Sequence, residues 1–302
     1  YKSKLLVKPV WGWNDEYVRR IRLLMLPAIL GVSVHQINAL VDTIIASMLE
    51  KGSISWLYFA DRLIEFPLGL FGIGIATVVL PSLSRLHANE DAKAFQQTMD
   101  WAVRFVLLMA LPAMAGLMVL GPLIIEVLYL HGEFTVEAAE RTYWAVVAYS
   151  SGLASYMTVK VLAPGYFSRQ DTKTPVRVGI IAMVSNIVFN LILAPFYGFV
   201  GLAVATAMSA TLNAVLLYRG LHQDGVYQIS RQTAVWIAKL VIATSVMAWG
   251  LHTLYRHWSS FANSFTELLI MMMGLIVVAM LSYFLSLLLM GIRPRHLKSD
   301  GF

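Results

Sequence analysis

Long apolar stretches alternate with short polar connections along most of the chain. A transmembrane helix needs about 20 consecutive, mostly apolar residues to cross the hydrocarbon core of a bilayer. Stretches of this kind lie at about residues 23–49, 54–80, 102–129, 142–168, 175–197, 199–218, 233–254 and 266–291. The pattern predicts an all-α polytopic membrane protein with eight transmembrane helices.

The composition supports the same class of protein. Hydrophobic residues make up 58% of the 302 residues and charged residues 13%, and the mean hydropathy is +0.69. Soluble domains are about 45–50% apolar and about 25% charged, so an ordinary soluble enzyme and a disordered chain are both excluded. The chain has no cysteine, which excludes disulfides, thiolate metal sites and a thiol nucleophile.

Basic residues are concentrated in every second connection. The odd-numbered flanks (residues 1–22, 85–104, 169–177, 219–232 and 293–302) carry 17 Lys and Arg residues, and the even-numbered flanks carry 3. Because cytoplasmic loops are enriched in Lys and Arg, both ends of this chain are expected in the cytoplasm. The net charge of +6 then reflects topology, and no nucleic-acid partner is predicted.

The beginning of the chain lacks the features of a signal peptide. Its first residue is Tyr1, and residues 1–22 are basic and aromatic, without an apolar core before a cleavage site. We therefore expect the chain to be an excerpt of a longer protein.

Charged residues inside the apolar stretches are candidates for a functional site, because a charge at mid-bilayer costs about 2.5–3.5 kcal/mol on insertion scales. Asp61, Arg62 and Glu65 lie in the second stretch. Arg62 and Glu65 share a helix face, so one interpretation is a cluster that neutralises itself. The other is a guanidinium that faces a wet cavity and receives an anionic substrate. Lys160, in the fourth stretch, either snorkels toward the cytoplasmic end or lines the cavity.

Residues other than large apolar ones follow helical spacing in three of the stretches. The stripes are Gly31, His35, Asn38 and Asp42; Asn186 and Asn190; and Thr206, Ser209 and Asn213. Hydrogen bonds between helices are the plain explanation, favoured for Ser209 and Asn213. Asp42 differs, because a buried carboxylate requires a cation or a proton. The candidate coupling-ion site consists of Asp42, Asn186, Asn190 and Thr206. Their oxygens suit a hard monovalent cation; the sequence leaves open whether they converge, and Asp42 is alternatively a proton carrier.

Several catalytic motifs are absent. The chain contains no G-x-x-x-x-G-K-[ST], no H-E-x-x-H and no G-x-S-x-G. No ATP motor, cofactor or enzymatic activity is therefore predicted. The residues alone indicate a polytopic secondary transporter with a cationic interior.

Two segments are long and distinctive. Residues 46–85 include A-D-R-L-I-E-F-P-L-G-L-F-G-I-G, and residues 159–177 read V-K-V-L-A-P-G-Y-F-S-R-Q-D-T-K-T-P-V-R. Both resemble signature segments of the MurJ (MviN) lipid II flippase family, within the multidrug/oligosaccharidyl-lipid/polysaccharide exporter superfamily. The resemblance covers the whole chain and is weakest in the last two apolar stretches.

The resemblance implies a domain organisation. Family members have two six-helix lobes around a central cavity, followed by two further helices, and this chain resembles the second lobe with the extra pair. The N-terminal lobe is then missing. The implied parts are a cytoplasmic basic and interfacial segment (1–22), a six-helix transporter lobe (23–218), a cytoplasmic loop (219–232), two extra transmembrane helices forming a lipid-tail groove (233–291) and a cytoplasmic basic tail (292–302).

The resemblance also implies a function. The family moves lipid II, the undecaprenyl-pyrophosphate-disaccharide-pentapeptide precursor of peptidoglycan, across the bacterial cytoplasmic (inner) membrane by alternating access. Arg62 matches a cavity arginine expected to meet the pyrophosphate, Glu65 matches a neighbouring acid, and Lys160 matches a lysine of the second segment. The energy would come from Na⁺ or H⁺ coupling or from the membrane potential. The implied partners are lipid II, membrane lipids and the missing N-terminal lobe.

Other functions remain as alternatives. A multidrug/cation antiporter of the same superfamily would use acidic residues such as Asp42 and Glu65, but Arg62 and Lys160 argue against it. A polysaccharide-lipid flippase of that superfamily is a further candidate. A non-transporting membrane scaffold for cell-wall synthesis has no need of charges at depth, and an intramembrane enzyme would change its lipid covalently.

Overall fold

The structure is a computed structural model that describes residues 15–258 and 264–292, with the backbone alone for residues 20–35. Its elements are α1 (Glu16–Ser47), α2 (Ser53–Pro67), the π-helix η1 (Leu68–Ile73), α3 (Gly74–Ala88), α4 (Ala92–Tyr129), α5 (Val136–Ser150), α6 (Leu153–Phe167), α7 (Lys173–Gln223), α8 (Arg231–Trp258) and α9 (Phe265–Leu289). These described residues contain no strand, which confirms the all-α fold class.

Several of the helices are long and apolar enough to cross a membrane. Within the described residues, five continuous helical runs qualify, or six if α5 and α6 are one bent span. The five runs are Ser53–Ala88, Ala92–Tyr129, Lys173–Gln223, Arg231–Trp258 and Phe265–Leu289. The chain is therefore a multi-pass membrane protein.

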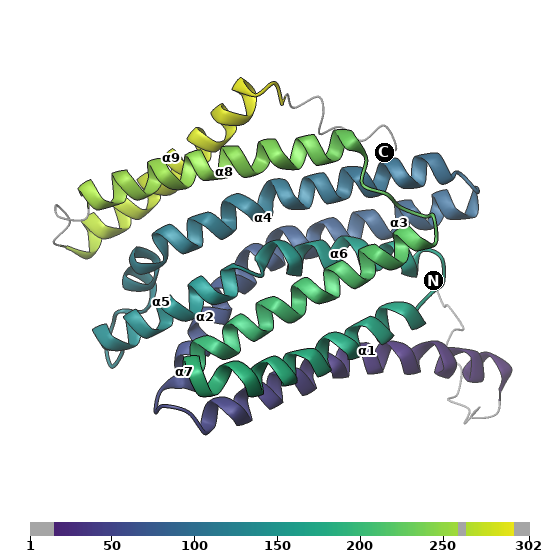
Figure 1. Ribbon diagram of the computed structural model, residues 1–302, viewed down its shortest axis with the longest axis horizontal. Helices are drawn as coiled ribbons and strands as arrows, with labels where there is room; N and C mark the ends of the chain where they lie inside the picture. Colours follow the sequence, from purple (N-terminus) through teal and green to yellow (C-terminus); the bar gives the residue numbers. More distant parts are fainter. Residues whose placement is uncertain (1–14, 259–263, 293–302) are drawn as a thin grey trace, which may run out of the picture.

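The connections between helices gather at two ends of the molecule. Figure 1 shows the α3–α4, α6–α7 and α7–α8 connections at the right-hand end, where α1 also begins, and the α1–α2 and α4–α5 connections at the left-hand end. Three flanks rich in Lys and Arg, residues 85–104, 169–177 and 219–232, lie at or next to the connections of the right-hand end. Connections that alternate in charge along the sequence therefore lie at opposite ends of the molecule.

Helix boundaries differ from the expected spans where polar residues continue a helix. α4 begins at Ala92, ten residues before the expected span, because the Asp91 side chain accepts a hydrogen bond from the Ala94 N–H (2.9 Å). Its first turns bury Phe95 and Met99 against the lobe. The start of α4 is amphipathic, with apolar residues on one face only. A search for long runs of apolar residues therefore does not detect it.

Two of the expected spans are interrupted by local backbone geometry. The fourth stretch is broken between Ser150 and Leu153, and α5 and α6 meet at an angle of 40°. α7 contains the fifth and sixth stretches in one run of 51 residues, but Gly198 (φ 57°, ψ −138°) leaves the helical region and reverses the chain. A Cβ added at Gly201 would lie 2.6 Å from the Leu193 carbonyl oxygen, so the two halves of α7 pack closely beside this reversal.

α4 lies at the centre of the molecule and contains two prolines. Pro112 and Pro122 lack the N–H that would bond the carbonyls four residues earlier, at Leu108 and Met118. A tyrosine hydroxyl replaces each missing donor. Tyr283 of α9 donates to the Leu108 oxygen (3.0 Å), and Tyr143 of α5 donates to the Met118 oxygen (3.0 Å).

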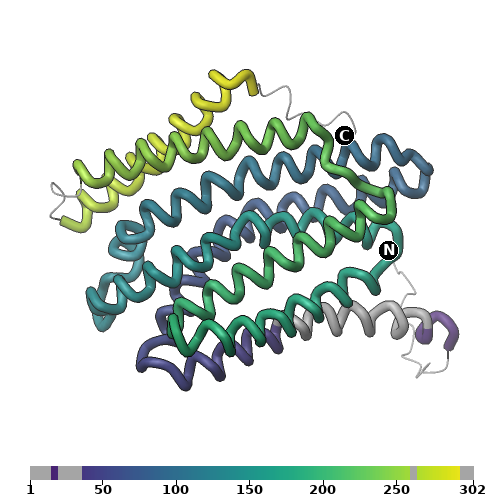
Figure 2. The backbone as a smooth tube through the Cα atoms, in the orientation of Figure 1, coloured from purple at the N-terminus to yellow at the C-terminus, as the bar shows by residue number. Residues whose placement is uncertain are grey.

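The α8–α9 pair packs against α4 and forms an apolar core separate from that of α1–α7. Figure 2 shows the pair on the side of α4 away from α1 and α7. Polar bonds tie these helices together: Arg104 Nε of α4 donates to Thr233 Oγ1 of α8 (2.8 Å), and Lys239 Nζ of α8 donates to the Met290 carbonyl at the end of α9 (2.8 Å). The cavity described next belongs to α1–α7 alone.

Candidate functional site

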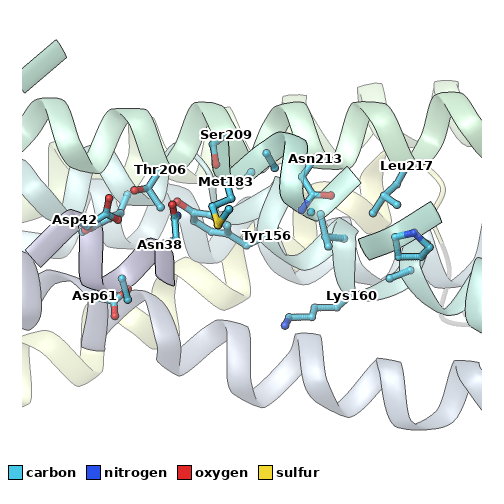
Figure 3. A pocket seen from close by; sticks show the side chains of 18 of the residues that line it. Asn38, Asp42, Asp61, Tyr156, Lys160, Met183, Thr206, Ser209, Asn213 and Leu217 are labelled. Atoms are coloured by element: carbon cyan, nitrogen blue, oxygen red, sulfur yellow. The ribbon is translucent and has the colours of Figure 1, made fainter. Parts of the chain in front are cut away.

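A cavity of about 1070 Å³ opens between the helices of α1–α7. Its polar lining residues include Asn38 and Asp42 of α1, Tyr58 and Asp61 of α2, Tyr149 of α5, Tyr156 and Lys160 of α6, and Thr206, Ser209 and Asn213 of α7; most of them are labelled in Figure 3. The lining extends from Ile54, near the start of α2, to Thr172 and Pro175 at the α6–α7 connection. The cavity therefore follows the helices over most of their length.

The four residues of the candidate coupling-ion site come together at this cavity. Asn190 Nδ2 lies 2.6 Å from Asp42 Oδ1 and 2.9 Å from Asn186 Oδ1, and Asn186 Nδ2 lies 3.2 Å from Thr206 Oγ1. Both asparagines are fully buried. The question that the sequence left open, whether these four side chains converge, is answered by the packing of α1 against both halves of α7.

Asn38 joins the same group through the Asn186 amide, one atom of which lies 3.1 Å from Asp42 Oδ1 and 2.9 Å from Asn38 Oδ1. These neighbours are both acceptors, so this atom is the amide nitrogen, which donates to both oxygens. We call Asn38, Asp42, Asn186, Asn190 and Thr206 the Asp42 cluster.

Arg62 and Glu65 lie on α2 beside the cavity lining. Arg62 Nη1 bonds Glu65 Oε2, and its guanidinium lies 4.9 Å from the centroid of the Tyr58 ring. Both charged side chains are about half exposed (51% and 49%). The predicted pairing on one helix face is therefore present, while the neighbours Tyr58 and Asp61 supply the lining itself.

Lys160 projects from α6 into the cavity. Its stem passes close to Gly72, where an added Cβ would lie 3.6 Å from Lys160 Cγ. Gly72 belongs to the π-helix η1, so the lysine lies against the irregular segment of the second span. π-bulges are frequent at functional sites. Of the two interpretations for Lys160, the structure favours cavity lining, because the side chain borders the cavity.

Several lining residues were missed or misjudged from the sequence. Ser209 and Asn213 were expected to hydrogen-bond between helices, but both line the cavity, and the buried Asn213 Oδ1 has no partner. Tyr58 and Tyr149 gave no signal, because an aromatic residue in an apolar stretch resembles a packing residue. For Tyr156 the one available clue was its position four residues before Lys160. The side chains of Gly31 and His35, the other members of the first stripe, lie outside the described residues.

Comparisons with known proteins agree on one family. A family model described as lipid II flippase MurJ matches residues 1–265. The chain is 55% identical over 302 residues to a probable lipid II flippase MurJ of Vibrio cholerae, covering 99% of this chain and 57% of that protein. A probable lipid II flippase MurJ of Haemophilus influenzae is 49% identical, with 98% and 59% covered. The chain thus spans a little more than half the length of these relatives.

Solved structures give the same result at the level of the fold. A lipid II flippase MurJ in an inward closed conformation superposes with a TM-score of 0.75 at 28% identity, over 94% of this chain and 57% of that one. An outward-facing MATE family transporter of the MOP superfamily gives a TM-score of 0.62 at 15% identity, over 93% and 66%, which shows the fold alone. With its family model matched over most of its length, the chain belongs to the lipid II flippase MurJ family.

Proposed function

We propose that this chain is part of a lipid II flippase, which carries the undecaprenyl-pyrophosphate-linked peptidoglycan precursor from the cytoplasmic to the periplasmic leaflet. The observation that carries the proposal is a large cavity lined by Lys160, with the Arg62–Glu65 pair beside its lining residues Tyr58 and Asp61, in a chain of this family. Charged groups inside a membrane are costly and usually functional. A non-transporting scaffold has no need of such charged groups.

We infer eight transmembrane spans from the lengths of the helices. At 1.5 Å per residue, the 51 residues of α7 extend about 76 Å, more than twice the roughly 30 Å hydrocarbon core. The reversal at Gly198 divides α7 into two spans. α5 with α6, and α2 with η1 and α3, each count as one span, and α1, α4, α8 and α9 complete the eight. An even number of spans and the basic flanks together favour cytoplasmic ends at an inner membrane.

Substrate recognition is assigned to the cations. A guanidinium donates parallel hydrogen bonds to a phosphate, so the diphosphate replaces Glu65 as the partner of Arg62, and Lys160 supplies a second positive charge from α6. The polyprenyl tail stays in lipid and runs along the α8–α9 pair, whose outward faces expose apolar side chains such as Val246, Trp249 and Leu281. Alternating access requires a second lobe to close the cavity, so we expect this chain to act with an N-terminal lobe.

The Asp42 cluster is proposed to bind the coupling ion. Its carboxylate, amide and hydroxyl oxygens suit Na⁺, and the buried Asn190 Oδ1 has no partner, which leaves a lone pair for a cation. A proton on Asp42 is the alternative coupling ion. The membrane potential adds about 2.3 kcal/mol per charge for each 100 mV, which would help to return an empty cationic carrier.

The experiment that tests this function uses Arg62→Ala in the full-length protein, expressed in cells depleted of their own flippase. With membrane abundance verified, accessibility of lipid II on the periplasmic face is expected to be lost. Arg141→Ala is the matched control, because Arg141 also pairs with a glutamate (Glu50, 3.2 Å) and stacks on an aromatic ring (Trp56, 5.5 Å). Neither of these partners lines the cavity, whereas the Tyr58 ring beside Arg62 does. Unchanged accessibility and growth in Arg62→Ala would reduce Arg62 to a structural partner of Glu65.

A further inference from the structure

Tyr156 lies on the cavity wall between two groups of polar residues. It precedes Lys160 by four residues on α6, so the two side chains share a helix face. Figure 3 shows Tyr156 with Asn38, Asp42 and Thr206 on one side and Lys160 and Asn213 on the other. A single aromatic side chain thus stands between the Asp42 cluster and the cation of α6.

The tip of the Tyr156 ring lies at the contact between α6 and α7. A Cβ added at Gly152 would lie 2.9 Å from Tyr156 Cζ and 2.7 Å from Ala207 Cα. The phenol end therefore lies near the backbone of α7 at Ala207, the residue that follows Thr206 of the Asp42 cluster. The absence of a side chain at Gly152 makes this close approach possible.

The Tyr156 hydroxyl is buried without a hydrogen-bond partner. Leaving a buried donor unpaired costs free energy, and an unpaired buried group in a native structure commonly marks a functional role or a place where a water or an ion binds. Asn190 Oδ1, in the Asp42 cluster, is likewise buried and unpaired. A donor and an acceptor that both lack partners therefore lie in this part of the lobe, on either side of the contact between α6 and α7.

We propose that Tyr156 is a positioning residue that links cation binding at the Asp42 cluster to diphosphate binding at Lys160. This inference rests on the proposed function and identifies a residue that couples the cation site to the diphosphate site. A cation among the cluster oxygens gives the Tyr156 hydroxyl oxygen a partner. The ring is then held against α7, and the turn of α6 that carries Lys160 is held with it.

The coupling has a definite sign. A cation in the Asp42 cluster strengthens binding of the anion, and by thermodynamic linkage the anion strengthens binding of the cation by the same factor. Loss of the hydroxyl removes the link but leaves the oxygen ligands of the cluster and the charge of Lys160 in place. Tyr156→Phe is therefore expected to weaken the coupling while each ligand alone still binds.

The test measures this coupling in purified full-length protein in lipid nanodiscs. The affinity for geranylgeranyl diphosphate is measured in sodium chloride and in choline chloride of equal ionic strength, and in choline at low and high pH so that protons are also tested. Wild-type protein is expected to bind the probe at least about five-fold more tightly with its coupling cation. In Tyr156→Phe, the cation is expected to change the affinity for the probe by less than about two-fold. The affinity measured without the cation should stay within about three-fold of the wild-type value.

Two further variants and the wild-type result separate the outcomes. Tyr255→Phe makes the same chemical change on α8, outside the cavity lining. In this variant the cation should increase the affinity for the probe as much as in the wild type. Gly152→Ala keeps the Tyr156 hydroxyl but displaces the ring, and should lose coupling. The inference is overturned if the cation increases the affinity of Tyr156→Phe for the probe as much as it does in the wild type. It is also overturned by a wild-type protein that binds the probe without any cation effect, although the proposed substrate site then stands. If wild-type protein does not bind the probe, the proposed function itself fails.

Discussion

Polar groups are arranged differently in two regions of the molecule, the cavity wall of α6 and α7 and the contact between α4 and the α8–α9 pair. At the contact, Tyr283 of α9 donates to the Leu108 carbonyl of α4, and Arg104 of α4 donates to Thr233 Oγ1 of α8. Buried atoms without a partner occur in both regions, Thr244 Oγ1 on α8 and the Tyr156 hydroxyl and Asn213 amide oxygen on the cavity side. The difference is that Tyr156 and Asn213 line the cavity, where a ligand can reach them, whereas the donors at the contact join helices to one another.

The comparison also separates stability from function. Removing a donor at the α4 contact leaves a buried carbonyl unpaired, so the cost falls on the folded state. Removing a group that has no partner costs the fold little and affects whatever it binds. Mutations in the two regions should therefore differ in which measurement they change.

The largest expected effect is on transport, from Lys160→Met in the cavity. Methionine keeps an unbranched stem beside Gly72 but removes the charge. Loss of a charge-assisted contact of about 1.5–3 kcal/mol corresponds to a reduction in lipid II transport of roughly ten-fold or more. The melting temperature should stay near that of the wild type, and Lys160→Arg should retain transport. Wild-type transport rates in Lys160→Met would mean that the ammonium only snorkels to the interface.

A smaller effect, on stability, is expected from Tyr283→Phe at the α4 contact. The Leu108 carbonyl freed by Pro112 then loses its donor, at a cost of about 1–3 kcal/mol. Thermal unfolding in detergent should reveal it, with transport at low temperature retained. Tyr143→Phe, which exposes the Met118 carbonyl in a half-buried place, should cost less. Equal stability of Tyr283→Phe and wild type would remove the contrast between the two regions.

The smallest effect is expected where α7 begins, outside the membrane. Asp171 Oδ1 accepts the Thr174 N–H (3.0 Å). Burial raises the pKa of this carboxyl, but hydrogen bonds from Thr174 and Lys173 outweigh it, and the pKa lies below its ordinary value of 3.8. A lowered pKa adds stability above pH 3.8 that is lost as the pH falls through the folded-state value.

Asp171→Asn should therefore lower stability by about 0.5 kcal/mol at neutral pH. The difference from wild type should shrink as the pH is lowered below about 4. Thermal unfolding of both proteins over this pH range measures it. A difference that grows toward low pH would contradict the sign of the pKa shift.

The long apolar stretches made the helices predictable, because length and hydrophobicity suffice for that inference. The break at Ser151 and the π-helix at Leu68–Ile73 were not predictable, because both depend on how neighbouring helices pack. The early start of α4 was missed for another reason. A segment that lies at the membrane surface buries only one face, and Phe95 and Met99 are too few to raise its average hydropathy.

In the candidate site, too, some features follow from local sequence and others require the tertiary structure. Helical spacing placed Asn186 and Asn190 on one face, and that local inference needed no tertiary structure. The bond from Asn190 to Asp42 joins residues 148 positions apart, which spacing within one helix does not specify. Helical spacing also placed Tyr156 on the face of Lys160, but only the packed structure reveals that its hydroxyl is buried without a partner.

Gly198 has a consequence for how the protein meets its surroundings. Because a single residue reverses the chain between the two halves of α7, no loop protrudes there for a protease, an antibody or an inserted tag to reach. At that end of the described chain, the α1–α2 and α4–α5 connections (residues 48–52 and 130–135) are the segments that can carry a label or be recognised from outside the bilayer.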